Sequence, residues 1–457
     1  MRRERLVVEA AVVDQPWLRA AQWVGRRLSR WRFELASVLV LAWVCSRLAG
    51  TYGTGAVRLG LAGAVGGVLA WPWSRRLVLR RFRHARVRRQ FLAGARRAGL
   101  VTAEDLVPAV GRVRDVPAGE RLALRVPPGC TAERVQGAAE SLAVCLRVRD
   151  VRAKRAEDDA SRVWLTVVRR DPLASFAPLP WPAAGAARMS LLEPVPVGMD
   201  EDGQPVTVGL VERNVLFGSE PGGGKSVAQS QLVAAAALDP DADLYLFDGK
   251  RVELAPWAPC AVRTVGPDVE AACDVLDGLV EEMDRRYELL LSRGRRKIER
   301  GDGLRLVVVV IDELAFFTAG GADRNAKALR AGFAERLHAL VGRGRAAGIV
   351  VLAATQKPSA DIVPTYLRDL FGFRWALRCS TPDASDTILG RGWASAGYSA
   401  TDVPAEARGV GYLLAEGGVP VRLRSYHLDD DTLLRVAERA AALRHGRPVD
   451  RQWEAAA

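Results

Sequence analysis

The stretch that most constrains the fold of this chain is "NVLFGSEPGGGKSVAQSQLVAAAAL", residues 214–238. A short apolar run leads into a glycine-rich segment, and an apolar pattern with helical spacing follows. A strand, a glycine loop and a helix in this order favour bound phosphate, because loop N–H groups and the helix N-terminus both attract negative charge. The segment therefore predicts a phosphate-binding loop inside an α/β fold.

The predicted loop departs at one position from the strict G-x-x-x-x-G-K-[ST] spacing. Ser219 stands where the first glycine is expected, one residue after Gly218. Lys225 is predicted to reach the β- and γ-phosphates of ATP, and Ser226 to ligate Mg²⁺. The full predicted nucleotide-binding stretch is Gly218, Ser219, Glu220, Pro221, Gly222, Gly223, Gly224, Lys225 and Ser226.

A second motif places two acids at the end of a predicted strand. The apolar run 306–311 is followed directly by Asp312 and Glu313. Charge at the end of a buried strand needs a partner, so we expect Asp312 to serve the metal ion and Glu313 to act as the general base on the attacking water. The alternative is a pair of exposed acids that cap the next helix.

A third strand-like run, "GIVVLAATQKPS", ends in Thr355 and Gln356. Gln356 is predicted to hydrogen-bond the attacking water or the γ-phosphate and to report its presence to the rest of the domain. The alternative is a strand-end glutamine without a chemical role.

Residues 191–425 alternate apolar strands with helices, and most of the strands are continuous apolar runs. Such runs are typical of parallel strands covered on both faces, so a three-layer α/β domain with a mostly parallel sheet is predicted. A small α+β domain, read as a β-α-β module with an N-cap at Thr131, is predicted over 100–171, with a proline-rich linker over 172–190. A helix and a polar tail are expected over 426–457.

Two apolar runs, 33–50 and 56–73, are each slightly short of the ~20 residues that span a bilayer. Arginines precede the pair and fill 75–89 after it, which predicts a two-helix membrane hairpin over 31–90 with both ends, including segment 1–30, in the cytoplasm. The chain is then expected at the cell membrane, its basic flank on anionic lipid headgroups. A pair of buried soluble helices, and nucleic acid as the partner of the flank, are the alternatives.

The charge balance agrees with an anionic partner, because 66 basic residues exceed 53 acidic ones and give a formal charge of +13. An arginine-rich composition of this kind is also typical of high-GC genomes, so the placement of charge is more informative than its sum. None of the six cysteines forms a C-x-x-C, and neither a disulfide framework nor a zinc site is predicted.

Six motifs appear in an order that resembles the motor domain of the FtsK/SpoIIIE family. They are "GSEPGGGKS", "LYLFDGKRVEL", "EMDRRYELLLSRG", "VVVVIDEL", "GRAAGIVVLAATQKPS" and "SDTILG". The resemblance covers about 195–425 and implies a RecA-like ring ATPase, a homo-hexamer that pumps double-stranded DNA. The Tra-type transfer proteins of conjugative elements in high-GC Gram-positive bacteria are the subgroup that this chain resembles.

The resemblance also implies roles for residues outside the phosphate loop. Asp248, Lys250 and Glu253 are expected near the nucleotide or a subunit interface. Arg343, Arg345 and Arg374 are candidates for an arginine that completes the neighbouring subunit's site. The loop 292–301, with its five basic residues, is a candidate DNA contact, or alternatively a solvated turn.

Two departures qualify the resemblance. Asp386 stands where the family often has an arginine, and too few residues follow Gly418 for the winged-helix module that many relatives carry. The expected activity is ATP-driven DNA translocation in conjugative transfer or chromosome segregation. A protein-secretion ATPase is the alternative, since similar motors sit on twin membrane helices there.

Overall fold

The computed structural model describes residues 46–47, 50–51, 53–55, 72–156, 158–174, 178–299, 302–321 and 323–444. Contacts divide the chain into two compact units, Met1–Gln90 and Phe91–Ala457. Most of both apolar runs lies outside the described residues, and so does most of the membrane hairpin predicted over 31–90. Within the described ranges, no helix is both long and apolar enough to cross a bilayer.

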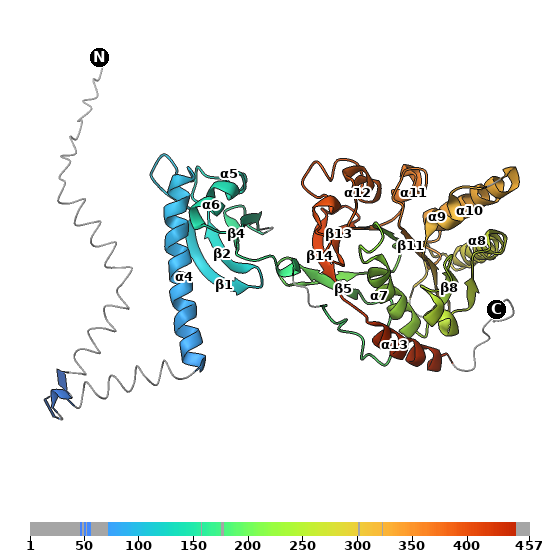
Figure 1. The fold of residues 1–457 in the computed structure, drawn as a ribbon, viewed down its shortest axis with the longest axis horizontal. Helices are drawn as coiled ribbons and strands as arrows, with labels where there is room; N and C mark the ends of the chain where they lie inside the picture. The colour runs from blue at the N-terminus through green and yellow to red at the C-terminus, as the bar shows by residue number, and fades with distance from the viewer. Residues whose placement is uncertain are drawn as a thin grey trace, which may run out of the picture. The chain divides into compact units, whose positions relative to one another are not determined.

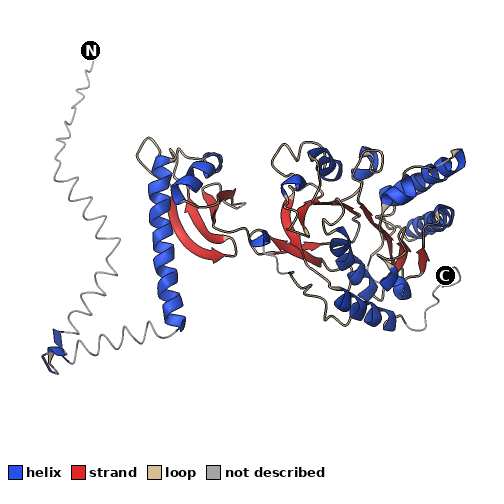
Figure 2. Ribbon diagram, viewed as in Figure 1, coloured by secondary structure: helices blue, strands red, loops and turns tan. Residues whose placement is uncertain are grey.

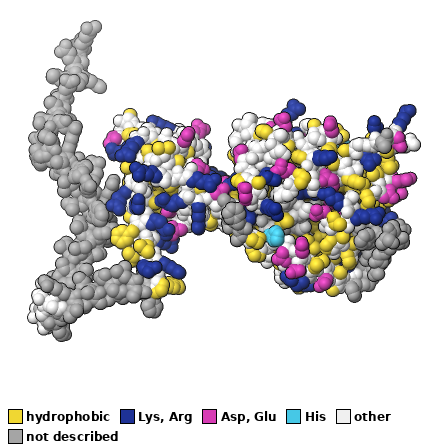
Figure 3. Space-filling view, in the orientation of Figure 1, with side chains coloured by type: hydrophobic (Ala, Val, Ile, Leu, Met, Phe, Trp, Pro, Cys, Tyr) yellow, Lys and Arg dark blue, Asp and Glu magenta, His cyan; other side chains and the backbone are white. Residues whose placement is uncertain are grey.

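Helix α4, Pro72–Arg97, contains the basic flank and passes from the first unit into the second. A proline in its first turn costs no hydrogen bond, because the first N–H groups of a helix have no intrahelical acceptor. Its N-terminal half exposes large apolar side chains, including Trp73 and Phe82, among the arginines. Figure 3 shows basic side chains along this helix.

The predicted small α+β domain contains a four-stranded antiparallel sheet of order β1-β2-β4-β3 with two short helices. Its elements are β1 (Ala109–Val116), β2 (Gly119–Arg125), α5 (Ala132–Gly137), α6 (Ala139–Leu146), β3 (Asp150–Arg155) and β4 (Arg162–Val168). Thr131 caps α5 as predicted, by accepting a 3.2 Å hydrogen bond from the N–H of Arg134.

The β-α-β reading of this segment was wrong in two respects. The predicted single helix is two helices that meet at Ala138. Strands β1 and β3 were missed, and both are edge strands of the sheet. Edge strands pair on one side only and carry charged side chains, so the sequences of β1 and β3 lack the regular apolar positions of β2 and β4.

The larger sheet has ten strands in the order β6-β5-β14-β13-β12-β7-β11-β10-β8-β9. Strands β12 through β9 in that order are parallel to one another, and β6, β5, β14 and β13 continue the sheet by antiparallel pairing. The strands are β5 (Val195–Asp200), β6 (Pro205–Val208), β7 (Val215–Gly218), β8 (Ala242–Phe247), β9 (Arg263–Val265), β10 (Leu306–Ile311), β11 (Ile349–Thr355), β12 (Phe373–Leu377), β13 (Val410–Ala415) and β14 (Val421–Ser425). The predicted mostly parallel α/β sheet is confirmed.

Helices cover both faces of this sheet, which Figures 1 and 2 show as three layers. They are α7 (Lys225–Leu238), α8 (Val269–Ser292), α9 (Leu314–Thr318), α10 (Arg324–Arg343), α11 (Thr365–Arg368), α12 (Pro382–Leu389) and α13 (Asp430–Ala442), with short 3₁₀ turns at Pro172–Ala174, Ala255–Cys260 and Ala400–Asp402. In β10, Val308 and Val310 belong to the core shared with α7 and α13, whereas Val307 and Val309 belong to the core on the opposite face. Burial on both faces explains why the strand is apolar at every position.

The proline-rich segment 172–190, predicted as a linker, is partly packed onto the larger sheet. Trp181 is buried, and its indole N–H donates a 2.9 Å hydrogen bond to the carbonyl of Pro196. The tail beyond residue 444 lies outside the described part of the chain.

Candidate functional site

The candidate site lies at the carboxyl edge of the parallel strands, where β7, β10 and β11 end side by side. β7 ends at Gly218, the glycine-rich loop follows, and α7 begins at Lys225. This is the strand, loop and helix order that the sequence predicted. Ligands of open α/β sheets bind at this edge, because the loops and helix N-termini face it.

Steric contacts explain why a glycine occurs one residue earlier than the motif requires. A Cβ atom on Gly218 would lie 2.2 Å from the side chain of Ile388, so this position has no room for a side chain. Ser219 is buried, its N–H donates to the carbonyl of Thr355 (3.2 Å) and its hydroxyl donates to the carbonyl of Glu220 (2.8 Å). Serine is therefore accommodated at the departing position without disturbing the loop.

The later glycines of the loop satisfy a backbone requirement. Gly222 and Gly224 have φ angles of +80° and +98°, which L side chains rarely adopt. A Cβ atom on Gly224 would also lie 2.7 Å from the backbone nitrogen of Gly409. The end of the loop therefore packs directly against the turn that precedes β13.

Lys225 is almost fully buried at the first position of α7, and its Nζ donates to the backbone carbonyl of Asp312. Burial lowers its pKa, and the nearby carboxylates of Glu313 and Asp312 oppose this shift. The only lysine of the loop thus stands between the phosphate loop and the acids that end β10.

Asp312 is fully buried, so the exposed-acid reading of this motif was wrong. Its Oδ1 accepts a 3.0 Å hydrogen bond from the N–H of Gly249, whereas its buried Oδ2 has no hydrogen-bond partner among the described residues. Burial raises the pKa of this carboxyl to about 6. A buried acceptor without a donor is costly, which indicates that the site is built for a further ligand.

Glu313 is held in place by three hydrogen bonds from the end of β11. Its Oε1 accepts from the hydroxyl of Thr355 at 2.9 Å, and its two carboxylate oxygens accept from the N–H of Gln356 at 3.1 and 3.0 Å. The glutamate is 8% exposed, so it is largely shielded from solvent. The role of Thr355 as its anchor was not predicted.

A pocket of 460 Å³ lies beside these residues: the glycine-rich loop, Lys225 and Gln356 line it, whereas Asp312, Glu313 and Thr355 lie behind its lining. Its lining comprises Pro178, Leu179, Ser219, Glu220, Pro221, Gly222, Gly224, Lys225, Ser226, Val227, Glu253, Gln356, Glu406, Arg408, Gly409, Arg424, Ser425 and His427. The wall formed by residues 406–409 and 424–427 was not predicted, because no local motif marks it. Only the antiparallel pairing of β13 with β14 brings these residues to the phosphate loop.

Comparison with known proteins agrees with this geometry. Residues 186–396 match the FtsK/SpoIIIE family. The chain carries an FtsK/SpoIIIE family domain. It is 27% identical over 345 residues to the DNA translocase SftA of Bacillus subtilis (strain 168), covering 72% of this chain and 34% of SftA.

A second relative is the DNA translocase FtsK of Staphylococcus aureus (strain Mu50 / ATCC 700699), 30% identical over 223 residues, which are 44% of this chain and 27% of that FtsK. The chain thus spans about a third or less of the length of these relatives. Among solved structures, the pCW3 conjugation coupling protein TcpA, in its monomer form with ATPγS, shares the fold. Its TM-score is 0.52 at 21% identity, over 79% of this chain and 99% of TcpA.

In the FtsK/SpoIIIE domain, none of the three candidate arginines lines the pocket of its own chain. Arg343 and Arg345 come before β11, at the amino edge of the sheet, where they form ion pairs with Asp284 and Glu416. Arg374 lies within β12 beside Asp369 (3.2 Å), and burial lowers its pKa. A role in the neighbouring subunit's site does not require cis contact, so it stays a prediction.

Asp386, the departure from the family pattern, has a local role. Its carboxylate accepts 2.8 Å hydrogen bonds from the N–H groups of Gly392 and Ala394 and so fixes the loop after α12. An arginine could not accept these bonds. The aspartate at this position therefore has a structural role of its own in this chain.

Asp248, Lys250 and Glu253, which follow β8, have different surroundings in the structure. Asp248 is buried and accepts hydrogen bonds from the N–H groups of Lys250 (3.2 Å) and Leu254 (2.9 Å), so it shapes the turn after β8. Glu253 lines the nucleotide pocket, and Lys250 is exposed.

The basic loop lies at the amino edge of the sheet, where the N–H of Ile298 donates to the carbonyl of Ala346 (3.0 Å). Arg293 and Arg295 pair with Asp302, and Lys297 pairs with Glu212 at 2.7 Å. The side chains of Arg293, Arg295 and Lys297 are exposed although that of Asp302 is buried, so these basic groups remain accessible to a polyanion. Arg300, also part of the motif, lies outside the described residues.

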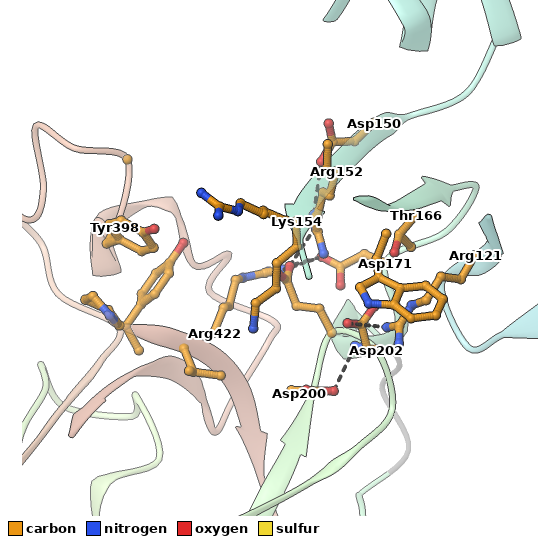
Figure 4. Close-up of a pocket in the computed structure, with 18 of the residues that line it drawn as sticks. Arg121, Asp150, Arg152, Lys154, Thr166, Asp171, Asp200, Asp202, Tyr398 and Arg422 are labelled. Carbon is orange, nitrogen blue, oxygen red and sulfur yellow. Dashed lines mark hydrogen bonds and ion pairs between the residues drawn. The ribbon is translucent and has the colours of Figure 1, made fainter. Parts of the chain in front are cut away.

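A larger pocket of 1120 Å³ lies between the four-stranded sheet and the β5–β14 part of the domain (Figure 4). Several of its charged groups pair with one another: Arg422 contacts Asp171 at 3.0 Å and Glu201 at 2.8 Å, and Arg152 contacts Glu201 at 2.7 Å. This pocket is lined by ion pairs that join two parts of the fold, and it contains none of the phosphate-loop residues.

Proposed function

We propose that this chain is a membrane-anchored, ATP-driven translocase of double-stranded DNA that acts in conjugative transfer or chromosome segregation. One observation carries the proposal: the buried acids that end β10 face the phosphate loop of an FtsK/SpoIIIE domain, with Lys225 in contact with Asp312. The names of the relatives, DNA translocases in both cases, support DNA as the cargo.

The pocket, together with Asp312 beside it, fits ATP and Mg²⁺. The glycine loop and the N-terminus of α7 favour phosphate, and Asp312 Oδ2 is a buried carboxylate oxygen without a donor. Mg²⁺ prefers oxygen ligands and keeps several waters, so the Ser226 hydroxyl and Asp312 would suffice as its protein groups. When bound, the ion neutralises charge on the phosphate oxygens.

The chain's own residues then divide the work of hydrolysis. Lys225 leaves the carbonyl of Asp312 and binds the terminal phosphates. Glu313, oriented by Thr355, accepts a proton from the attacking water. Because the N–H of Gln356 is bonded to Glu313 and its side chain lines the pocket, Gln356 links the state of the nucleotide to β11.

A homo-hexameric ring completes the proposal. Arg343, Arg345 or Arg374 would approach the phosphates bound to the adjacent subunit and stabilise the charge that develops there. The basic loop 292–301 would contact the phosphate backbone of the duplex, which attracts Lys and Arg without regard to sequence.

Membrane attachment rests on the sequence of 31–90 and on helix α4. The two apolar runs supply the hairpin, and the arginines of α4, with the exposed Trp73 and Phe82 among them, suit an anionic membrane surface. The motor would then lie on the cytoplasmic side.

The decisive experiment measures ATP hydrolysis by the full chain with and without duplex DNA. A DNA translocase is expected to hydrolyse ATP several-fold faster with duplex, and the stimulation should fall as salt rises. Turnover that ignores DNA would contradict the proposal and leave the polypeptide-secretion ATPase as the better reading. A chain with Lys225→Ala gives the background rate.

A further inference from the structure

The buried arginine side chains of this fold differ in whether an acid or a hydrogen-bond acceptor lies beside them. Within the described ranges four arginine residues are less than 9% exposed: Arg286, Arg368, Arg424 and Arg444. A guanidinium stays protonated, so its burial is costly unless it is paired or hydrogen-bonded. Arg286 bonds Glu282 at 2.6 Å, Arg368 bonds Asp369 at 2.8 Å, and Arg444 donates to several backbone carbonyls.

Arg424 is the exception. It is 6% exposed, and its guanidinium has neither an ion pair nor a hydrogen bond among the described residues. Its Nη1 is fully buried without an acceptor. Burial lowers its pKa, and no carboxylate opposes that shift. The fold therefore buries a positive charge without providing the anion that would stabilise it.

Arg422, on the same strand as Arg424, differs from it in having acidic partners. Arg422 lies two residues earlier in β14, on the same face of the sheet, and is paired with Asp171 and Glu201 (Figure 4). The strand thus carries one arginine with two acids and one with none. The unpaired arginine is the one that lines the nucleotide pocket.

Backbone contacts tie the strand of Arg424 to the phosphate loop. The N–H of Ser425 donates to the carbonyl of Gly409 (2.8 Å), and the N–H of Gly409 donates to the carbonyl of Gly223 (3.2 Å). The wall that carries Arg424 is therefore fixed directly against the loop that would hold phosphate.

We propose that Arg424 binds phosphate oxygens of the nucleotide in its own chain, and that the nucleotide is the anion which this buried guanidinium lacks. The inference rests on the proposed ATP site. Arg424 reaches the nucleotide from strand β14, whereas Lys225 reaches it from helix α7. The two cations would therefore contact the nucleotide from two different elements of the fold. Nucleotide binding would then relieve the cost of the buried charge.

The test measures equilibrium binding of ATP, ADP and adenosine to the full-length wild type, Arg424→Met and Arg422→Met. Arg424→Met is expected to bind ATP and ADP about tenfold more weakly, the effect of losing one charge-assisted hydrogen bond, and adenosine unchanged. Arg422→Met should bind all three as the wild type does. ATP affinity unchanged in Arg424→Met, or an equal loss for adenosine, would overturn the inference; a wild type that binds no ATP would instead overturn the proposed ATP site.

Thermal unfolding separates a ligand contact from a merely structural role. Without nucleotide, Arg424→Met should unfold at the same temperature as the wild type or higher, because an uncompensated charge is removed. Arg422→Met should unfold at a lower temperature, because the buried Asp171 loses its 3.0 Å ion pair and Glu201 loses one of its two arginine partners. ADP should raise the unfolding temperature of Arg424→Met less than that of the wild type; a variant that is destabilised without nucleotide yet gains the full rise would contradict the proposal.

Discussion

Glu313 and Thr355 are joined by a 2.9 Å hydrogen bond between the carboxylate and the hydroxyl, across the adjacent ends of β10 and β11. The proposed general base therefore has its orientation set by a residue on another strand. This relationship makes Thr355 a positioning residue, and it gives the catalytic proposal a test that does not touch the base itself.

Glu313→Gln is expected to bind ATP and to lower its turnover at least about 100-fold, because general bases contribute 10²–10⁴-fold. Thr355→Val should lower kcat about tenfold with KM for ATP little changed, and Thr355→Ser, which keeps the hydroxyl, should restore most of the rate. Steady-state kinetics of the three variants provide the measurement. Full turnover in Glu313→Gln would remove this residue as the base.

The raised pKa of Asp312 predicts how the free energy of unfolding changes with pH. Its pKa of about 6 in the folded chain exceeds the ordinary 3.8, so the folded state binds the proton more tightly and stability from this group is lost as pH rises from about 4 to about 6. Without nucleotide, Asp312→Asn should exceed the wild type at pH 7 by about 3 kcal/mol at most. The difference should vanish near pH 4.

Urea unfolding at several pH values measures this effect. Asp361→Asn, a change at an exposed aspartate, serves as the matched control and should behave like the wild type at every pH. Equal stability of Asp312→Asn and wild type at pH 7 would show that the buried carboxylate carries no such cost.

Alanine substitutions at Gly222 and Gly224 distinguish the cost of backbone strain from the cost of a steric clash. Alanine at either position pays roughly 1–2 kcal/mol for a positive φ. Gly224→Ala should cost clearly more, because its Cβ would meet the backbone of Gly409 at 2.7 Å, whereas no neighbour lies within 4 Å of a Cβ on Gly222. The free energy of unfolding without nucleotide decides between them, and equal losses would contradict the contact.

Substitutions at Gly218 and Ser219 test why the first glycine of the phosphate loop occurs one residue early. Ser219→Gly should change ATP affinity less than about threefold, since the serine bonds only within the loop and its neighbour strand. Gly218→Ala should destabilise the fold, because the new methyl would overlap Ile388. Binding isotherms and thermal unfolding of the two variants test this; a large affinity gain in Ser219→Gly would show that the departure weakens the site.

The basic loop predicts a change in salt dependence. Replacing Arg293, Arg295 and Arg296 together by alanine should weaken duplex binding and make the plot of log K against log[salt] shallower by about 0.9 for each DNA phosphate that the loop no longer neutralises. Arg435→Ala, an exposed arginine on α13, is the control and should leave the slope unchanged. An unchanged slope in the triple variant would exclude this loop as a major DNA-binding element.

Features that depend on neighbours along the chain could be predicted from the sequence. The strand, glycine loop and helix of 215–238 were predictable because the φ requirements of Gly222 and Gly224 and the helical spacing of α7 are local. The acids after β10 were predictable because a strand buried on both faces is apolar throughout, so charge marks its end.

Contacts between groups that are distant along the chain could not be predicted in this way, because they depend on the fold as a whole. The bond from Thr355 to Glu313, the contact of Gly224 with Gly409 and the arrival of Arg424 at the pocket all depend on strand order, and β14 is brought there by antiparallel pairing. Strand order follows from how the two apolar faces of the sheet are covered as a whole. No short stretch of sequence specifies the strand order. For this reason the pocket wall formed by residues 406–409 and 424–427 could not be predicted from the sequence.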